Sequence, residues 1–259
     1  MDKIVIICNN EIENILTGIY KAFELYKSGH LLDNINILIS EDGHYDISFL
    51  TEYINIETDF DKAYKTMEHI KTRLGGLIHR DVLYSLCHFD TNRGYVLFRF
   101  LHYCFKNGRS AAEDLTNPYV LKVMELSRKC GNETHHYYGF VRFNSMNNIL
   151  YAKIKPKCNV IPLIIEHFSD RFYIENWIIE DETHNLYAVH KANGDTRLFR
   201  GDLFTEDFYS KDIIVSDKYE QLWKTFFETI AIKERTNPKC QRNLMPLWIR
   251  EHMNEFKSW

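Results

Sequence analysis

Residues 137–155 read YYGFVRFNSMNNILYAKIK, and they mark the point at which the chain changes from helices to a sheet. Two segments rich in aromatic and β-branched residues, Tyr137–Asn144 and Ile149–Lys155, flank the polar turn Ser145–Asn148. Such residues favour strands, and a short polar turn between two strand-like runs is typical of a hairpin. This stretch therefore predicts a β-hairpin.

Before this hairpin the sequence predicts a mainly helical part with short strands, residues 1–127. The apolar runs Asp2–Cys8, Ile35–Ile39 and Tyr53–Glu57 have the length of short strands. The polar stretch Ser40–Ser48 is the best candidate for an internal loop. Apolar residues at helical spacing predict that most of the remaining sequence is helical, over residues 12–28, 59–74, 77–87, 91–109 and 117–130.

After the hairpin, the pattern predicts a helix over Val160–Phe168 and C-terminal helices from Tyr219 onward, restarting at Asn237-Pro238. Three further strands are expected between them, with Asn193-Gly194 as the strongest hairpin turn: Phe172–Ile179, Leu186–His190 and Thr196–Phe199. The predicted fold class is α+β, with a helical N-terminal part, a small antiparallel sheet with one intervening helix, and C-terminal helices. Residues 128–259 form the second part, and we expect both parts to make one compact unit.

The composition indicates a cytoplasmic protein. The apolar run at the N-terminus is far shorter than the roughly 20 residues that a spanning helix needs, so we expect no signal peptide and no membrane anchor. Six scattered cysteines form no Cys-x-x-Cys pair, which favours free thiols and gives no reason to expect a metal or another cofactor. Motifs for phosphate loops, hydrolase elbows and zincins are also missing from the sequence.

Charge is unevenly distributed along the chain. The formal net charge is −4, yet residues 128–171 and 231–259 each carry more Lys and Arg than Asp and Glu. Because phosphate binding depends on local fields, these two basic segments are candidates for contact with nucleic acid. The predicted DNA-binding residues are Arg142, Lys153, Arg171, Arg235 and Arg242.

Glu133 and His135 are the most suggestive candidates for catalysis, because a carboxylate can orient an imidazole as an acid or base. On a strand the two side chains would share a face, whereas on a helix they would not. Gly131 either ends the preceding helix or lies within it, so the sequence leaves both arrangements open. In the structural alternative, the two residues only satisfy buried polar groups between helix and sheet.

His167 is the third candidate for catalysis. With Arg171 it has the i, i+4 spacing that places both side chains on one side of a helix, where they could meet a phosphate. The neighbouring stripe of Phe168 and Phe172 is expected to be core. A buried histidine with satisfied hydrogen bonds is the alternative for His167.

The run Glu133–Phe143, ETHHYYGFVRF, resembles the Glu-x-His-Arg and Gly-Phe-x-Arg-Phe segment of a bacterial family of DNA-repair or DNA-metabolism proteins without an assigned activity. Further matches follow in the same order: Leu150-Tyr151-Ala152, Pro162-Leu163, His167-Phe168, Arg171-Phe172, Trp177, Leu222-Trp223, Arg235, Asn237-Pro238, Gln241 and Met245-Pro246. The sequence departs from this pattern at His136, where arginine is expected, and at Leu247–Arg250, which replaces an Arg-Tyr-Trp cluster.

Members of the family that this sequence resembles are encoded beside a radical-SAM protein, and some are fused to a uracil-DNA-glycosylase-like domain. The resemblance therefore implies DNA and a radical-SAM protein as partners. The leading hypothesis is a DNA-binding accessory protein in DNA repair or modification. The alternatives are an interaction scaffold for the radical-SAM partner, and an enzyme that processes a base or nucleotide with Glu133 and His135.

Overall fold

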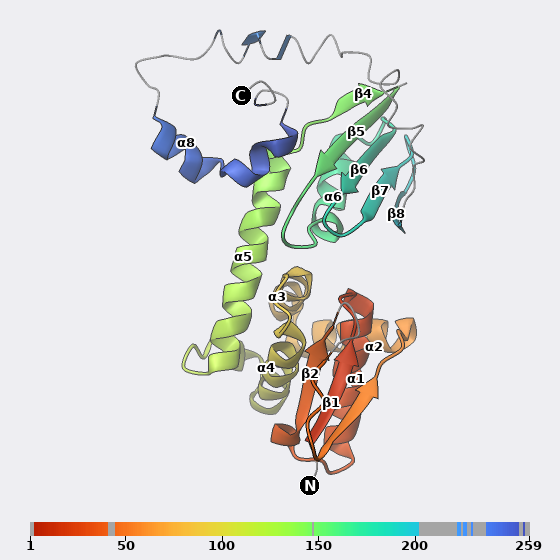
Figure 1. Ribbon diagram of the computed structural model, residues 1–259, viewed down its shortest axis with the longest axis vertical. Helices are drawn as coiled ribbons and strands as arrows, with labels where there is room; N and C mark the ends of the chain where they lie inside the picture. Colours follow the sequence, from red (N-terminus) through yellow and green to blue (C-terminus); the bar gives the residue numbers. More distant parts are fainter. Residues whose placement is uncertain are drawn as a thin grey trace. The chain divides into compact units, whose positions relative to one another are not determined.

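The computed structural model describes residues 3–40, 45–146, 148–201, 222–223, 225–226, 229, 237–253 and 256. The chain divides into two compact units, Met1–Gly131 and Asn132–Trp259. Each unit has its own sheet, and both combine helices with strands (Figure 1). The predicted α+β class is therefore confirmed.

The first unit contains a three-stranded parallel sheet in the order β2-β1-β3. Its strands are β1 (Lys3–Cys8), β2 (Ile35–Ile39) and β3 (Thr51–Asn55). The first two match the predicted strands, and the third lies two residues earlier than predicted. In the register, Ile6 of β1 lies between Ile37 and Ile54, so apolar side chains line up across the sheet.

Helices make up the rest of the first unit, as the apolar spacing predicts. They are α1 (Ile12–Lys27), α2 (Phe60–Leu74), α3 (Gly76–Cys87) and α4 (Arg93–Asn107), with short 3-10 turns η1 (Leu32–Asn34) and η2 (Arg109–Glu113). Asp59 caps α2 by accepting a hydrogen bond from Lys62 N, and this satisfies one of the backbone donors that a helix start leaves unpaired. The fully buried residues Ile15, Ile19 and Leu97 belong to the core of this unit.

Helix α5 (Pro118–Phe140) extends into the stretch 137–155, where the sequence predicts a hairpin. Tyr137–Asn144 was predicted as a strand, but the helix continues to Phe140 and strand β4 (Asn144–Met146) begins only at Asn144. The strand prediction from the aromatic residues at Tyr137 onward is wrong, because burial along this segment follows the period of a helix. The buried positions are Val120, Val123, Leu126, Cys130, Glu133, Thr134 and Tyr137.

The second unit contains a five-stranded sheet in the order β4-β5-β6-β7-β8. After β4 come β5 (Ile149–Ile154), helix α6 (Ile161–Arg171), β6 (Trp177–Asp181), β7 (Leu186–His190) and β8 (Thr196–Arg200). The sheet was predicted to be antiparallel, but it is mixed. Because α6 crosses over between them, β5 and β6 run parallel, while the other neighbouring strands are antiparallel.

Two asparagines shape the predicted turns of this sheet. Asn148, between β4 and β5, has a φ of 65°, and Asn193, between β7 and β8, has a φ of 58°. Asparagine tolerates this left-handed conformation better than most residues. The turn at Asn193 is closed by a hydrogen bond of 2.9 Å from Gly194 N to Lys191 O. Both hairpins are thus present, although Ser145 and Met146 of the first predicted turn belong to β4. Strand β6 begins at Trp177 and not at the predicted Phe172.

The described C-terminal helices are α8 (Pro238–Leu244) and the 3-10 helix η5 (Leu247–His252). The side chain of Asn237 caps α8 by accepting from Cys240 N, and the restart at Asn237-Pro238 is confirmed. Pro246 lies between α8 and η5. Most of the predicted helix from Tyr219 lies outside the described residues. Among the helices that the structure does describe, none has the length and apolar character needed to cross a membrane.

Gly18 of α1 allows this helix to pack closely on β1. A Cβ atom at this position would overlap Sγ of Cys8, which is buried in the core. Replacing Gly18 with alanine should therefore lower the free energy of unfolding by about 1–3 kcal/mol, the usual cost of overpacking a core. Urea unfolding followed by circular dichroism measures this change.

The matched control is Gly139→Ala on α5, where a Cβ would meet no atom within 4 Å. Alanine is the better helix former, so this variant should be as stable as the parent or slightly more stable. Equal stability of the two variants would contradict the close packing of α1 on β1.

Candidate functional site

Glu133 lies on α5, and its carboxylate is directed at the loop between β5 and α6. One oxygen, Oε1, accepts a hydrogen bond of 2.7 Å from Lys157 N, and Oε2 accepts one of 3.1 Å from Cys158 N. The side chain is only 7% exposed. Both oxygens thus bind backbone N–H groups that need an acceptor. This arrangement fits the structural alternative, in which Glu133 satisfies buried polar groups between helix and sheet.

His135 does not face Glu133. Both residues lie on α5, and side chains two positions apart on a helix point in different directions. Glu133 is buried while His135 is exposed. The carboxylate therefore does not orient this imidazole in the structure.

Tyr138 connects the two candidate histidines. Its ring centroid lies 6.3 Å from that of His135 and 4.6 Å from that of His167 on α6. The Tyr138 hydroxyl donates a 3.1 Å hydrogen bond to the backbone oxygen of Leu163, which fixes the ring between the two helices. The row His135, Tyr138 and His167 is the arrangement of candidate residues that the fold brings together.

His167 has one unusual property. Its Nε2 atom is buried and has no hydrogen-bond partner within the part of the chain that the structure describes. Buried ring nitrogens are normally paired, because an unpaired polar atom costs free energy. The alternative of a satisfied core histidine therefore does not describe His167, whereas the predicted core role of Phe168 is confirmed by its burial.

The arginines near this row differ in their contacts. Arg171, in the last turn of α6, is exposed, and its guanidinium lies 5.6 Å from the ring centroid of Phe172. Arg142 follows α5 and donates to the backbone oxygens of Gly139 and Val141. Arg171 thus presents its charge to the surroundings, while Arg142 also holds the end of α5.

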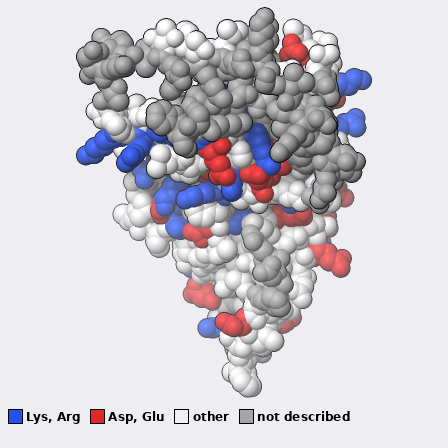
Figure 2. Space-filling model, turned by 45° about the horizontal axis from the view of Figure 1, so that its top comes forward, with Lys and Arg blue, Asp and Glu red and all other residues white. Residues whose placement is uncertain are grey.

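Two lysines of the basic segment 128–171, Lys153 and Lys155, are in ion pairs with glutamates. Lys153 Nζ lies 2.7 Å from Glu182 and 3.5 Å from Glu180, and Lys155 Nζ lies 3.2 Å from Glu251. Burial lowers the pKa of Lys153, but the hydrogen bond and charge of Glu182 and the charge of Glu180 outweigh it, so that the pKa is raised. Acidic and basic side chains also lie side by side in Figure 2.

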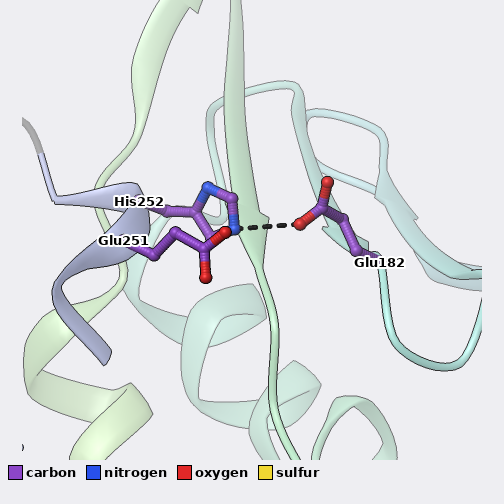
Figure 3. Close-up of side chains that lie close together, drawn as sticks. All are labelled: Glu182, Glu251 and His252. Atoms are coloured by element: carbon purple, nitrogen blue, oxygen red, sulfur yellow. Dashed lines mark hydrogen bonds and ion pairs between the residues drawn. The ribbon is translucent and has the colours of Figure 1, made fainter. Parts of the chain in front are cut away.

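A cluster that the sequence did not predict joins η5 to the end of β6. His252 Nε2 lies 3.0 Å from Glu182 Oε2, and one ligand atom each from Glu182, Glu251 and His252 lie within 4.8 Å of one another (Figure 3). Such residues can ligate divalent cations. Here, however, both carboxylates already pair with lysines, so we interpret the cluster as an ion-pair network that holds η5 against the sheet. No local signal links residues 70 positions apart.

The two departures from the resembled family pattern meet in the structure. The ring of His136 stacks on Phe140 at 5.8 Å and lies edge-on to Trp248 of η5 at 6.3 Å. Burial, followed by the charge of His135, lowers the pKa of His136, which favours the neutral ring in this aromatic contact. An arginine at 136 would bring a charge into this contact. The two places that depart from the resembled pattern are therefore in contact in this structure.

Of the remaining predicted DNA-binding residues, Arg242 is exposed on α8, and Arg235 lies outside the described residues.

The carboxylate of Glu133 should contribute to stability. In Glu133→Gln, one of the two N–H groups would face an amide nitrogen and lose its acceptor. We expect the free energy of unfolding to fall by about 1–3 kcal/mol, measured by urea unfolding. Glu166→Gln, an exposed residue on α6, is the control and should leave stability unchanged. Equal stability of all three proteins would show that the loop does not depend on Glu133.

Comparison with known proteins places this site within a family. No curated protein matches the chain. One family model, described as a domain of unknown function (DUF4130), matches residues 91–255, which is more than half of the 259 residues. The match begins before α4 and includes α5, the five-stranded sheet, α6 and the described C-terminal helices. The chain therefore belongs to the DUF4130 family, a family of unknown function.

Proposed function

We propose that this protein is a DNA-binding accessory protein in DNA repair or modification that acts with a radical-SAM partner. One structural observation carries the DNA-binding part. Arg171 and Arg242 are exposed and, among the described residues, form no ion pair with a carboxylate. Guanidinium groups in this state attract phosphates and can bind them through two parallel hydrogen bonds.

The ion pairs of the lysines refine this proposal. Lys153 would have to leave Glu180 and Glu182 before it could bind a phosphate, and Lys155 would have to leave Glu251. Breaking such pairs offsets the gain from a new phosphate contact. The arginines, and not Lys153, are therefore expected to supply most of the electrostatic attraction to DNA.

The radical-SAM partner and the repair or modification process rest on the resemblance of Glu133–Phe143 and the later motifs to the DNA-metabolism family. Phosphate contacts position a nucleic acid without reading its sequence. Recognition of a particular base or lesion would then belong to the partner or to other residues of the complex. This division of roles is what the term accessory protein describes here.

A specific observation favours the scaffold as a second candidate. Leu244 of α8 and Leu247 of η5 are 69% and 61% exposed, close together in the chain. Exposed apolar residues of this size are often buried by a protein partner. In the scaffold proposal, these leucines contact the radical-SAM protein and the chain need not touch DNA.

The enzyme alternative finds less support in the geometry. Glu133 and His135 point in different directions, and the Glu133 carboxylate is occupied by two backbone N–H groups. An enzyme proposal would have to be built on His167 and Tyr138 instead.

The DNA proposal predicts that Arg171→Glu/Arg242→Glu weakens binding to labelled single- and double-stranded DNA by at least about tenfold at low salt. The slope of log affinity against log salt should become shallower by about 0.9 for each lost contact to duplex DNA. Fluorescence anisotropy across a salt series measures both quantities. The control is Lys71→Glu/Arg80→Glu, which makes the same change in net charge on exposed residues of the first unit.

Unchanged affinity in the arginine variant, or equal losses in both variants, would contradict this proposal, because the attraction would then not depend on these positions.

The scaffold proposal predicts that Leu244→Asp/Leu247→Asp disrupts co-purification with the radical-SAM neighbour. The reason is that burying a carboxylate in an apolar interface costs a large amount of free energy. A stable complex of the parent protein, combined with no DNA affinity of this chain alone, would favour the scaffold over direct DNA binding. Retention of the complex by the aspartate variant would exclude these leucines from the interface.

A further inference from the structure

A groove of about 830 Å³ lies in the first unit between α1, α2 and α4. Small-molecule sites are commonly hollows of roughly 300–1,000 Å³. The groove is separate from the residues to which the proposed function assigns DNA or protein contact, because its lining comes from residues 20–27, 65–74 and 101–108.

The floor of the groove is apolar. Ile70 and Leu74 of α2 and Leu101 and Cys104 of α4 line it, and all four belong to the buried core. Burial raises the pKa of the Cys104 thiol to about 12, so this residue also presents a neutral surface. These side chains are already almost fully buried, so the apolar area that a ligand could remove from water lies on the residues above them.

Aromatic rings form the walls above this floor. The ring of Phe105 is 36% exposed, and its centroid lies 5.9 Å from that of Phe23 in an edge-to-face contact. Tyr26 is 40% exposed and meets the ring of His102 at 4.8 Å. The apolar surface therefore continues from the core to the mouth of the groove.

The exposed part of the lining is strongly cationic. Four exposed basic residues take part in it, from all sides of the groove: Lys27, Lys65, Arg73 and Lys106. Within the described chain, none of the four forms an ion pair with a carboxylate. Glu24 is the acidic residue of the described lining, and it lies 3.6 Å from Lys21 outside the groove.

The neighbouring histidine is consistent with this positive field. Burial lowers the pKa of His102, and the charges of Lys106 and Arg99 lower it further. His102 is therefore neutral at pH 7 and adds to the apolar wall. The four basic side chains carry the same charge, and an anion bound among them would be attracted to all four.

From the apolar lining and the four basic residues, which have no carboxylate partner among the described residues, we infer that the groove binds an amphiphilic anion: an acyl chain or similar apolar body that carries one carboxylate or phosphate group. The apolar body lies on Ile70, Leu74 and Leu101. The anionic group lies at the mouth, within reach of the flexible lysines and Arg73. A purely polar anion would leave the exposed rings of Tyr26 and Phe105 in water, and a neutral or cationic amphiphile would give the basic side chains no opposite charge.

Isothermal titration calorimetry of the full chain with dodecyl phosphate, below the concentration at which it forms micelles, tests this inference. We expect saturable binding that is at least about tenfold tighter than that of dodecyltrimethylammonium or of inorganic phosphate. Lys65→Glu/Arg73→Glu should weaken the binding by at least about tenfold. Laurate in place of dodecyl phosphate distinguishes a carboxylate from a phosphate head.

Two further variants make the result specific. Lys71→Glu/Arg80→Glu changes the net charge equally but lies outside the groove, and it should keep the parent affinity. Phe105→Ser removes part of the exposed wall. It should weaken the binding of dodecyl phosphate without weakening the binding of inorganic phosphate. Circular dichroism confirms that each variant is folded.

Three outcomes would overturn the inference. Anionic and cationic amphiphiles could bind equally, which would leave the basic residues without a role. Inorganic phosphate could bind as tightly as dodecyl phosphate, which would show that the apolar lining contributes nothing to the affinity. Finally, the chain could bind vesicles of anionic lipid but not monomeric dodecyl phosphate, which would make this surface a membrane contact and not a ligand site.

Discussion

The carboxylate of Glu133 connects the long helix of this protein to its second sheet. A helix end and a loop between strand and helix both contain backbone N–H groups that need acceptors. By accepting from Lys157 N and Cys158 N, Glu133 fixes the loop from which α6 begins. The position of α6 then determines where His167 meets Tyr138 and where Arg171 is exposed. The candidate residues of the second unit thus depend on a buried acid whose two oxygens bind backbone N–H groups.

The same unit shows why a count of basic residues says little about phosphate binding. Lys153 and Lys155 both lie in the basic segment 128–171, yet in the structure each forms an ion pair with a glutamate. The pKa of Glu182 illustrates the balance. Burial would raise it, but Lys153 and His252 stabilise the ionised form and lower it overall. Arg171 and the basic residues at the groove of the first unit have no such partners among the described residues, so their charges remain available to attract an external anion.

Membership of the DUF4130 family concerns residues 91–255, and therefore α4, α5 and the second unit. The parallel sheet β2-β1-β3 precedes this region. The groove between α1, α2 and α4 combines residues from both sides of this limit, since Ile70 comes before it and Phe105 after it. A ligand bound there would consequently contact both the matched region and the sequence that precedes it.

The sequence by itself determined most elements of the fold, because apolar spacing and turn residues are local signals. It located β1, β2, α1 and α2, the turn at Asn193 and the restart at Asn237-Pro238. It failed at Tyr137–Phe140, where aromatic residues fit a strand and a helix equally well until burial selects one face. It left Glu133 between two roles, and only the approach of the β5–α6 loop showed which groups its carboxylate binds. The Glu182–His252 contact and the cationic groove were decided by tertiary structure alone, because each joins residues that are far apart in the chain and have no pattern in common.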